Sequence, residues 1–90
     1  MAEGANAVRA ALLKEFGTVH IHEGFDSNTK DALLDFNAEG RNFRVRVTYE
    51  YDTDFASGQL KVSLARLGEA LRASGKGEAC VMTTGIKSIG

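Results

Sequence analysis

The sequence predicts an α+β fold, a two-layer sandwich in which two helices pack on one face of a mostly antiparallel sheet of 3–5 strands. Residues 43–51, FRVRVTYEY, alternate apolar and polar side chains, as does a strand with one buried face. Residues 5–16 and 64–74 repeat apolar side chains at the three- and four-residue steps of amphipathic helices. Glu39-Gly40 separates two alternating runs, as in a β-hairpin. One face of the sheet is therefore expected to be covered and the other to meet solvent.

The size and composition of the chain suit one small globular domain spanning residues 1–90. Hydrophobic side chains make up 43% and charged ones 26% of the 90 residues, and the formal net charge is −1. Such a balance gives no bulk attraction to nucleic acid or anionic lipid. The single cysteine, Cys80, excludes an internal disulfide. Without an apolar run of membrane-spanning length or a secretory leader, we expect a cytoplasmic protein with no membrane partner.

The N-terminal third of the chain is expected to hold a helix, a strand and a turn. The helix covers residues 5–16, with Asn6 as its N-cap and Gly17 as the left-handed residue after its end. The strand covers residues 18–25, where apolar residues alternate with two histidines. Asp, Ser and Asn at residues 26–28 are typical of a turn.

The Glu39-Gly40 pair also predicts the register of the hairpin. A two-residue loop needs positive φ angles, which glycine adopts readily. With these residues in the loop, Ala38 lies opposite Arg41. Apolar residues then meet on one face and a carboxylate meets a guanidinium on the other, and a slip by one residue would mismatch every pair. The predicted pairs are Phe36 with Phe43, Asp35 with Arg44, Leu34 with Val45, and Ala32 with Val47.

The segment before the second helix allows two interpretations. Leucines at positions 60, 64, 67 and 71 could form one stripe of a helix that starts near Ser57. That helix would leave Val62 facing water, so we favour a break. Residues 59–62 are then short extended chain, Ser63 is the N-cap, and the helix runs over residues 64–74.

The remaining C-terminal segments are expected to be simple. We predict a loop over residues 52–58, between the long strand and this segment. A last strand is expected over residues 79–84, after a glycine-rich turn. Residues 85–90 are expected to form a flexible tail.

The face expected to meet solvent carries the candidate binding residues. These are His20, His22, Asp35, Arg44 and Arg46. The two histidines have the spacing of a metal pair on one side of a strand, and Asp35 is a conceivable neighbour. Zinc needs at least a third ligand, and one His-x-His motif without cysteines is a weak signal. We therefore expect no metal and no cofactor.

Motifs of catalysis and of nucleotide or calcium binding fail on their spacing. A calcium-binding loop from Asp52 would need glycine and glutamate where the chain has Ser57 and Ser63. Residues 75–77, Gly-Lys-Gly, lack the remaining positions of a phosphate-binding loop. Cys80 has no base near it in the sequence. We therefore expect that the protein is not an enzyme and has no catalytic residues.

The favoured function is non-enzymatic binding, through a protein partner or a homodimer. Small one-sided sheets associate through their edges or faces, and symmetric dimers are the commonest oligomers. Leu33 on the solvent face, together with Ile86 and Ile89, lacks an evident partner within the chain. We identify no known family from the motifs of this sequence.

The alternative function is binding of an anionic ligand or RNA across His20, His22, Arg44 and Arg46. The order helix, three strands, helix is also that of a double-stranded-RNA-binding domain. Such domains need basic residues at the start of the second helix, which here begins LARLGEAL. Nucleic acid is therefore the less favoured partner.

Overall fold

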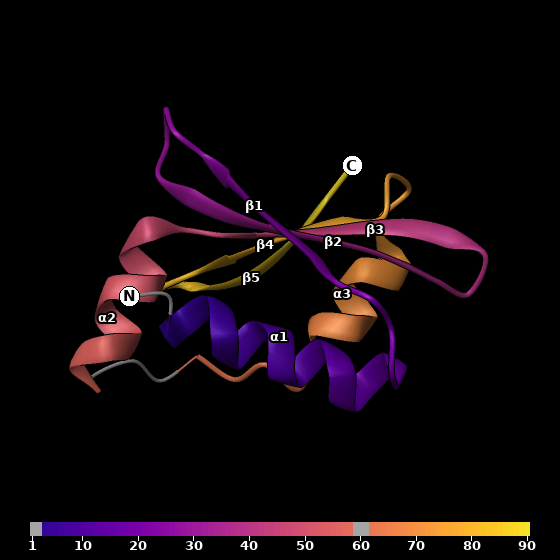
Figure 1. Cartoon of the computed structure of the whole chain (residues 1–90), viewed down its shortest axis with the longest axis horizontal. Helices are drawn as coiled ribbons and strands as arrows, with labels where there is room; N and C mark the ends of the chain where they lie inside the picture. Colours follow the sequence, from indigo (N-terminus) through magenta and orange to yellow (C-terminus); the bar gives the residue numbers. More distant parts are fainter. Residues whose placement is uncertain (1–2, 59–61) are drawn as a thin grey trace.

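The computed structural model describes residues 3–58 and 62–90. Within these ranges the strands form one sheet in the order β1-β2-β3-β4-β5, in which β3 and β4 run parallel and the other neighbours antiparallel. The predicted α+β class with a mostly antiparallel sheet is confirmed, although the described residues form three helices rather than two (Figure 1). The elements are α1 (Glu3–Phe16), β1 (His22–Asp26), β2 (Asp31–Ala38), β3 (Arg41–Val47), α2 (Tyr49–Ser57), α3 (Leu67–Ala73), β4 (Glu78–Met82) and β5 (Gly85–Ile89).

One apolar cluster joins the helices to the central strands. Alternate residues of β2, β3 and β4 enter this cluster, and the residues between them point to the opposite face. In Figure 1, α2 lies near the N-terminal end of α1 and α3 near its C-terminal end. The buried members are Val8, Leu12, Ile21, Leu34, Phe36, Phe43, Val45, Val47, Tyr51, Leu67, Leu71, Ala79 and Val81.

The hairpin between β2 and β3 has the predicted turn and register. Glu39 and Gly40 have φ angles of 56° and 73°, so both lie in the left-handed region that a tight hairpin loop requires. Ala38 pairs with Arg41. The other predicted pairs are also confirmed: Phe36 with Phe43, Asp35 with Arg44, Leu34 with Val45, and Ala32 with Val47.

Helix α1 is confirmed, but it begins at Glu3 and Asn6 is therefore not its N-cap. A carboxylate from a distant helix caps it instead. Asp52 Oδ1 accepts hydrogen bonds from the backbone N–H groups of Gly4 at 2.6 Å and Ala5 at 3.1 Å. At the other end Gly17 has a φ of 81°, as predicted.

Strand β1 is shorter than predicted. Pairing with β2 starts at His22 and continues to Asp26, so the first half of the predicted segment 18–25 is not a strand. Ile21, just before β1, is buried in the core cluster and links α1 to the sheet. The turn predicted at residues 26–28 is confirmed, since Asp26 accepts a hydrogen bond from the backbone of Asn28.

The strand predicted over residues 43–51 ends at Val47, and the loop predicted over residues 52–58 is mostly helix α2. Thr48 explains the change. Its backbone is extended, and its Oγ1 accepts a hydrogen bond from Tyr51 N at 3.2 Å, which caps the helix. Acidic residues in the first turn further favour a helix N-terminus there. Tyr51 is buried as predicted, but from a helix.

Helix α3 begins later than predicted. It covers Leu67–Ala73 rather than residues 64–74, and Ser63 is not its N-cap. Ser63 Oγ instead accepts a hydrogen bond from Ala65 N at 3.2 Å, within the turn that leads to the helix. The extended segment predicted at residues 59–62 falls largely on positions 59–61, which lie outside the described residues.

The prediction that residues 85–90 form a flexible tail is wrong. Gly85–Ile89 forms β5, which pairs antiparallel with β4. The last predicted strand, over residues 79–84, is confirmed as Glu78–Met82.

Buried Ser74 explains why the end of the chain is held. Its hydroxyl donates a hydrogen bond to the carbonyl oxygen of Ile89 in β5. The hydroxyl oxygen of Ser74, Oγ, also accepts hydrogen bonds from the backbone N–H groups of Lys76 at 3.2 Å and Glu78 at 3.0 Å. One side chain therefore joins the end of α3, the following turn and the last strand.

We expect Leu34→Ala to lower the free energy of unfolding by about 2–5 kcal/mol, because it opens a cavity in the core. Leu34 is 1% exposed. The matched control is Leu33→Ala, which changes the neighbouring, half-buried residue on the opposite face and is expected to cost less. Urea unfolding followed by circular dichroism measures both. Equal losses would contradict the assignment of the covered face.

We expect Ser74→Ala to cost about 1–3 kcal/mol, because it leaves buried hydrogen-bonding groups of the backbone without their partner. Amide hydrogen exchange in β5 should accelerate more than exchange in β2. Ser88→Ala is the control, since Ser88 is exposed and its hydroxyl donates one hydrogen bond within the described part of the chain, to Ala70 O at 2.8 Å. Unchanged exchange in β5 after Ser74→Ala would show that the Ser74 hydrogen bonds do not hold β5 in place.

Candidate functional site

The face of the sheet opposite the core cluster carries most of the predicted site residues. Residues that are paired across neighbouring strands point to the same face. The strand register therefore defines this polar face by the following residues: His22, Gly24, Asp26, Asp31, Leu33, Asp35, Asn37, Asn42, Arg44, Arg46, Glu78, Cys80, Met82, Gly85, Lys87 and Ile89.

Arg44 and Asp35 form a bidentate ion pair on this face. Arg44 Nε lies 2.7 Å from Asp35 Oδ1, and Arg44 Nη2 lies 2.9 Å from Asp35 Oδ2. These hydrogen bonds raise the pKa of Arg44 above the ordinary value of arginine. One edge of the guanidinium is consequently occupied by a residue of the same chain.

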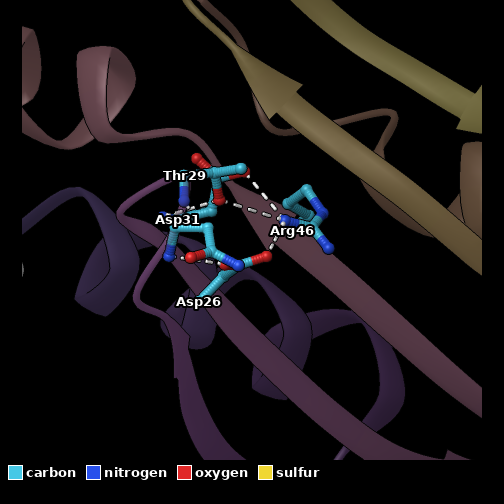
Figure 2. A network of polar contacts seen from close by, with 5 residues as sticks. Asp26, Thr29, Asp31 and Arg46 are labelled. Carbon is cyan, nitrogen blue, oxygen red and sulfur yellow. Dashed lines mark hydrogen bonds and ion pairs between the residues drawn. The ribbon is translucent and has the colours of Figure 1, made fainter.

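Arg46 lies in a network with three residues around the β1–β2 turn (Figure 2). Its Nη1 donates to Asp31 Oδ2 at 2.9 Å, Asp26 Oδ2 at 3.2 Å and Thr29 Oγ1 at 3.4 Å. Asp31 is only 8% exposed, and its carboxylate therefore needs a cationic partner. Arg46 lies on the polar face, as its place in the alternating sequence predicts. Its partners could not be predicted, because they depend on the pairing of β1 with β2.

Asp26 is further fixed by the turn that it begins. Its Oδ1 accepts hydrogen bonds from the backbone N–H groups of Asn28 at 2.9 Å and Thr29 at 3.3 Å. These bonds, and after them the bond from Arg46, hold the pKa of Asp26 below its ordinary value. Asp26 therefore stays ionised and ties the tip of the β1–β2 hairpin to β3.

His20 and His22 contact each other at the start of β1. Their ring centroids are 4.6 Å apart in an edge-to-face arrangement, and both residues are exposed. His22 pairs with Asp35, whose two oxygens already bind Arg44. Within residues 3–58 and 62–90, no group of three or more His, Cys, Asp or Glu side chains is arranged to hold a metal ion.

Cys80 lies on the polar face between Arg46 and Lys87 in the strand register. It is 9% exposed. Burial raises the pKa of the Cys80 thiol, which disfavours the thiolate that a nucleophile requires. The arrangement therefore suits a packing role for this side chain rather than catalysis.

The edge of the sheet at β1 is a second feature of the site. Association through a sheet edge was predicted from the sequence, but not which strand forms that edge. β1 is at the end of the strand order and has β2 as its strand neighbour. Four of its five residues are exposed. Phe25, on the side opposite the polar face, is 62% exposed, the largest value among the large hydrophobic side chains that the structure describes. Glu23 beside it pairs with Arg9 of α1 at 3.3 Å.

Comparisons with known proteins give no further guidance. A scan against protein-family models, a search of curated proteins and a search of solved structures each found no match. Among the helices in the described ranges, none is both long and apolar enough to cross a membrane. The surface chemistry of the chain itself is therefore the basis for inferring function.

We expect Arg46→Met to raise the pKa of Asp26 only part of the way to its ordinary value, because the hydrogen bonds from Asn28 and Thr29 remain. A lowered carboxyl pKa stabilises the fold at pH values above the ordinary Asp value of 3.8, and this contribution is lost as the pH falls through the lowered value. NMR titration of the carboxyl carbon measures the shift. The control is Arg44→Met, which removes a partner of Asp35 and should leave the Asp26 titration unchanged.

Proposed function

We propose that this chain is a non-catalytic protein-interaction module. Its partner binds at the β1 edge of the sheet, next to the polar face. The observation that carries the proposal is the exposed Phe25 on an edge strand. Edge strands present unpaired backbone N–H and C=O groups to which another chain can add a strand. A large exposed apolar side chain beside them supplies the burial that such pairing needs.

The cations of the polar face give less support to the alternative function, binding of an anionic ligand or RNA. Arg44 binds both oxygens of Asp35, and Arg46 binds Asp26 and Asp31. These carboxylates offset the charges of both arginines, which weakens the attraction of the polar face for a phosphate. The aromatic rings Phe36 and Phe43 lie in the core cluster, away from the face where bases would stack.

A binding role also fits one hollow of the surface better than catalysis does. This hollow lies between the β4–β5 turn and the segment before α3. Among the described residues that line it, the polar ones are Ser63, Arg66, Thr83 and Thr84, and none of these is a histidine or a carboxylate that could act as an acid or base. The buried Cys80 thiol is not activated either.

A photoreactive phenylalanine analogue at position 25 tests the proposed function. We expect irradiation in cell extract to give covalent protein adducts from position 25, because the partner covers Phe25. The matched control is the same analogue at Phe55, an aromatic residue on α2 that is 38% exposed. Mass spectrometry identifies each adduct as a second copy of the chain or as another protein. Equal yields from both positions, or none from position 25, would overturn the proposal.

A further inference from the structure

We propose that the partner at the β1 edge is a second copy of this chain, bound through antiparallel pairing of the two β1 strands about a two-fold axis at Gly24. This inference rests on the proposed function and names its partner. A symmetric interface requires that the same surface be complementary to itself. The strand His22–Asp26, HEGFD, meets that requirement when it is centred on its middle residue.

Complementary hydrogen bonding, between an imidazole donor and a carboxylate acceptor, is the first argument for this pairing. With Gly24 on the axis, His22 lies opposite Asp26 of the partner subunit, and symmetry repeats the pair. Both residues belong to the polar face, so the imidazole and the carboxylate lie on the same side of the joined sheet. Asp26 Oδ2 binds Arg46 at 3.2 Å and has a second lone pair free for a donor on the partner.

Burial of Phe25 is the second argument. In the same register Phe25 lies opposite the partner's Glu23 and diagonal to the partner's Phe25, within the reach of aromatic side chains. The carboxylate of Glu23 is held by Arg9 of its own helix at 3.3 Å, which leaves its methylene groups to cover the ring. A side chain that is 62% exposed in the single chain is thereby covered.

The alternatives in register are less favourable. If both sets of helices lie on the same side of the joined sheet, the two strands can shift only in steps of two residues, because facing side chains must match. A shift in one direction places Glu23 opposite the partner's Glu23, where like charges repel. A shift in the other direction leaves only residues 24–26 of each strand paired. The register centred on Gly24 pairs all five residues.

The resulting dimer is expected to be weak. Two five-residue strands bury less surface than a standard stable interface. Pairing should therefore depend on concentration, and sedimentation velocity should show a dimer that dissociates on dilution.

A cysteine at Gly24 tests the two-fold axis directly, in a background that carries Cys80→Ala. Residues facing each other across antiparallel strands have Cα atoms about 4.5–5.5 Å apart, within the range that a disulfide bridges. A Cβ at Gly24 would meet Leu33 Cβ at 3.8 Å, an ordinary contact, so the fold should accept the change. We expect mild oxidation to link Gly24→Cys into a dimer many times faster than Ser27→Cys. Ser27 is the control because it lies in the exposed turn, away from the axis.

Substitutions of exposed His22 test its pairing with Asp26 of the partner subunit without touching the core. We expect His22→Glu to weaken the dimer several-fold, because it places two carboxylates opposite each other, and His22→Lys to retain or strengthen it. Equal linking rates for Gly24→Cys and Ser27→Cys, or a wild-type chain that stays monomeric at millimolar concentration, would overturn self-pairing. A different protein captured at position 25, together with a monomeric chain, would refute this inference and leave the proposed function standing. No adduct from position 25 would refute both.

Discussion

The pairing of β2 with β3 around the Glu39-Gly40 turn is the constraint on which the rest of the structure depends. Both turn residues have positive φ, which fixes a two-residue loop and thus the register. In this register Leu34 meets Val45 inside the core, while Asp35 meets Arg44 outside it. A slip by one residue would put the carboxylate under the helices and the apolar pairs in water. Burial of each large side chain stabilises the correct register by about 1.5–3 kcal/mol.

Polar side chains distant in sequence then hold the helices to this hairpin. Asp52 caps α1 from α2, and Ser74 joins α3 to β5. Arg72 of α3 binds Glu39 in the hairpin turn and Glu15 of α1, each at 2.8 Å, and its guanidinium lies 4.6 Å from the ring centroid of Phe16. Exposed ion pairs contribute little individually. Together these contacts orient short elements that could not be stable alone.

Local patterns predicted the hairpin because its register needs only a turn and two alternating runs. The same reasoning failed where a local signal competed with a stronger one. Tyr49 and Tyr51 continue the alternation of β3, but the Thr48 cap starts a helix there. β5 could not be predicted, because the hydrogen bond from the Ser74 hydroxyl to Ile89 in β5 cannot be inferred from the sequence near Gly85. Strand β5 depends on tertiary contacts and not on its own propensity.

Part of the candidate site could likewise be predicted from local sequence patterns, and part could not. The pair of Arg44 with Asp35 followed from the hairpin register and was predictable. The partners of Arg46 depend on the register in which β2 pairs with β1. The sequence does not give the length of the turn between these strands, so this register could not be predicted. The exposure of Phe25 could not be predicted either, since alternation alone places it among the inward-facing residues. Whether such a residue is covered depends on what packs beneath an edge strand.

The Arg46 network bears on the choice between the face and the edge as the binding surface. Its hydrogen bonds to Asp26 and Asp31 already satisfy these charges. Removing these bonds to bind an anion would leave the buried carboxylate of Asp31 and the half-buried carboxylate of Asp26 without this partner. The same bonds hold the end of β1 against β3, across β2 (Figure 2). An edge strand that is fixed in this way loses little conformational entropy when another strand pairs with it. The arginine therefore favours binding at the edge by holding β1 in place, and a phosphate would gain less from the face than a strand gains from the edge.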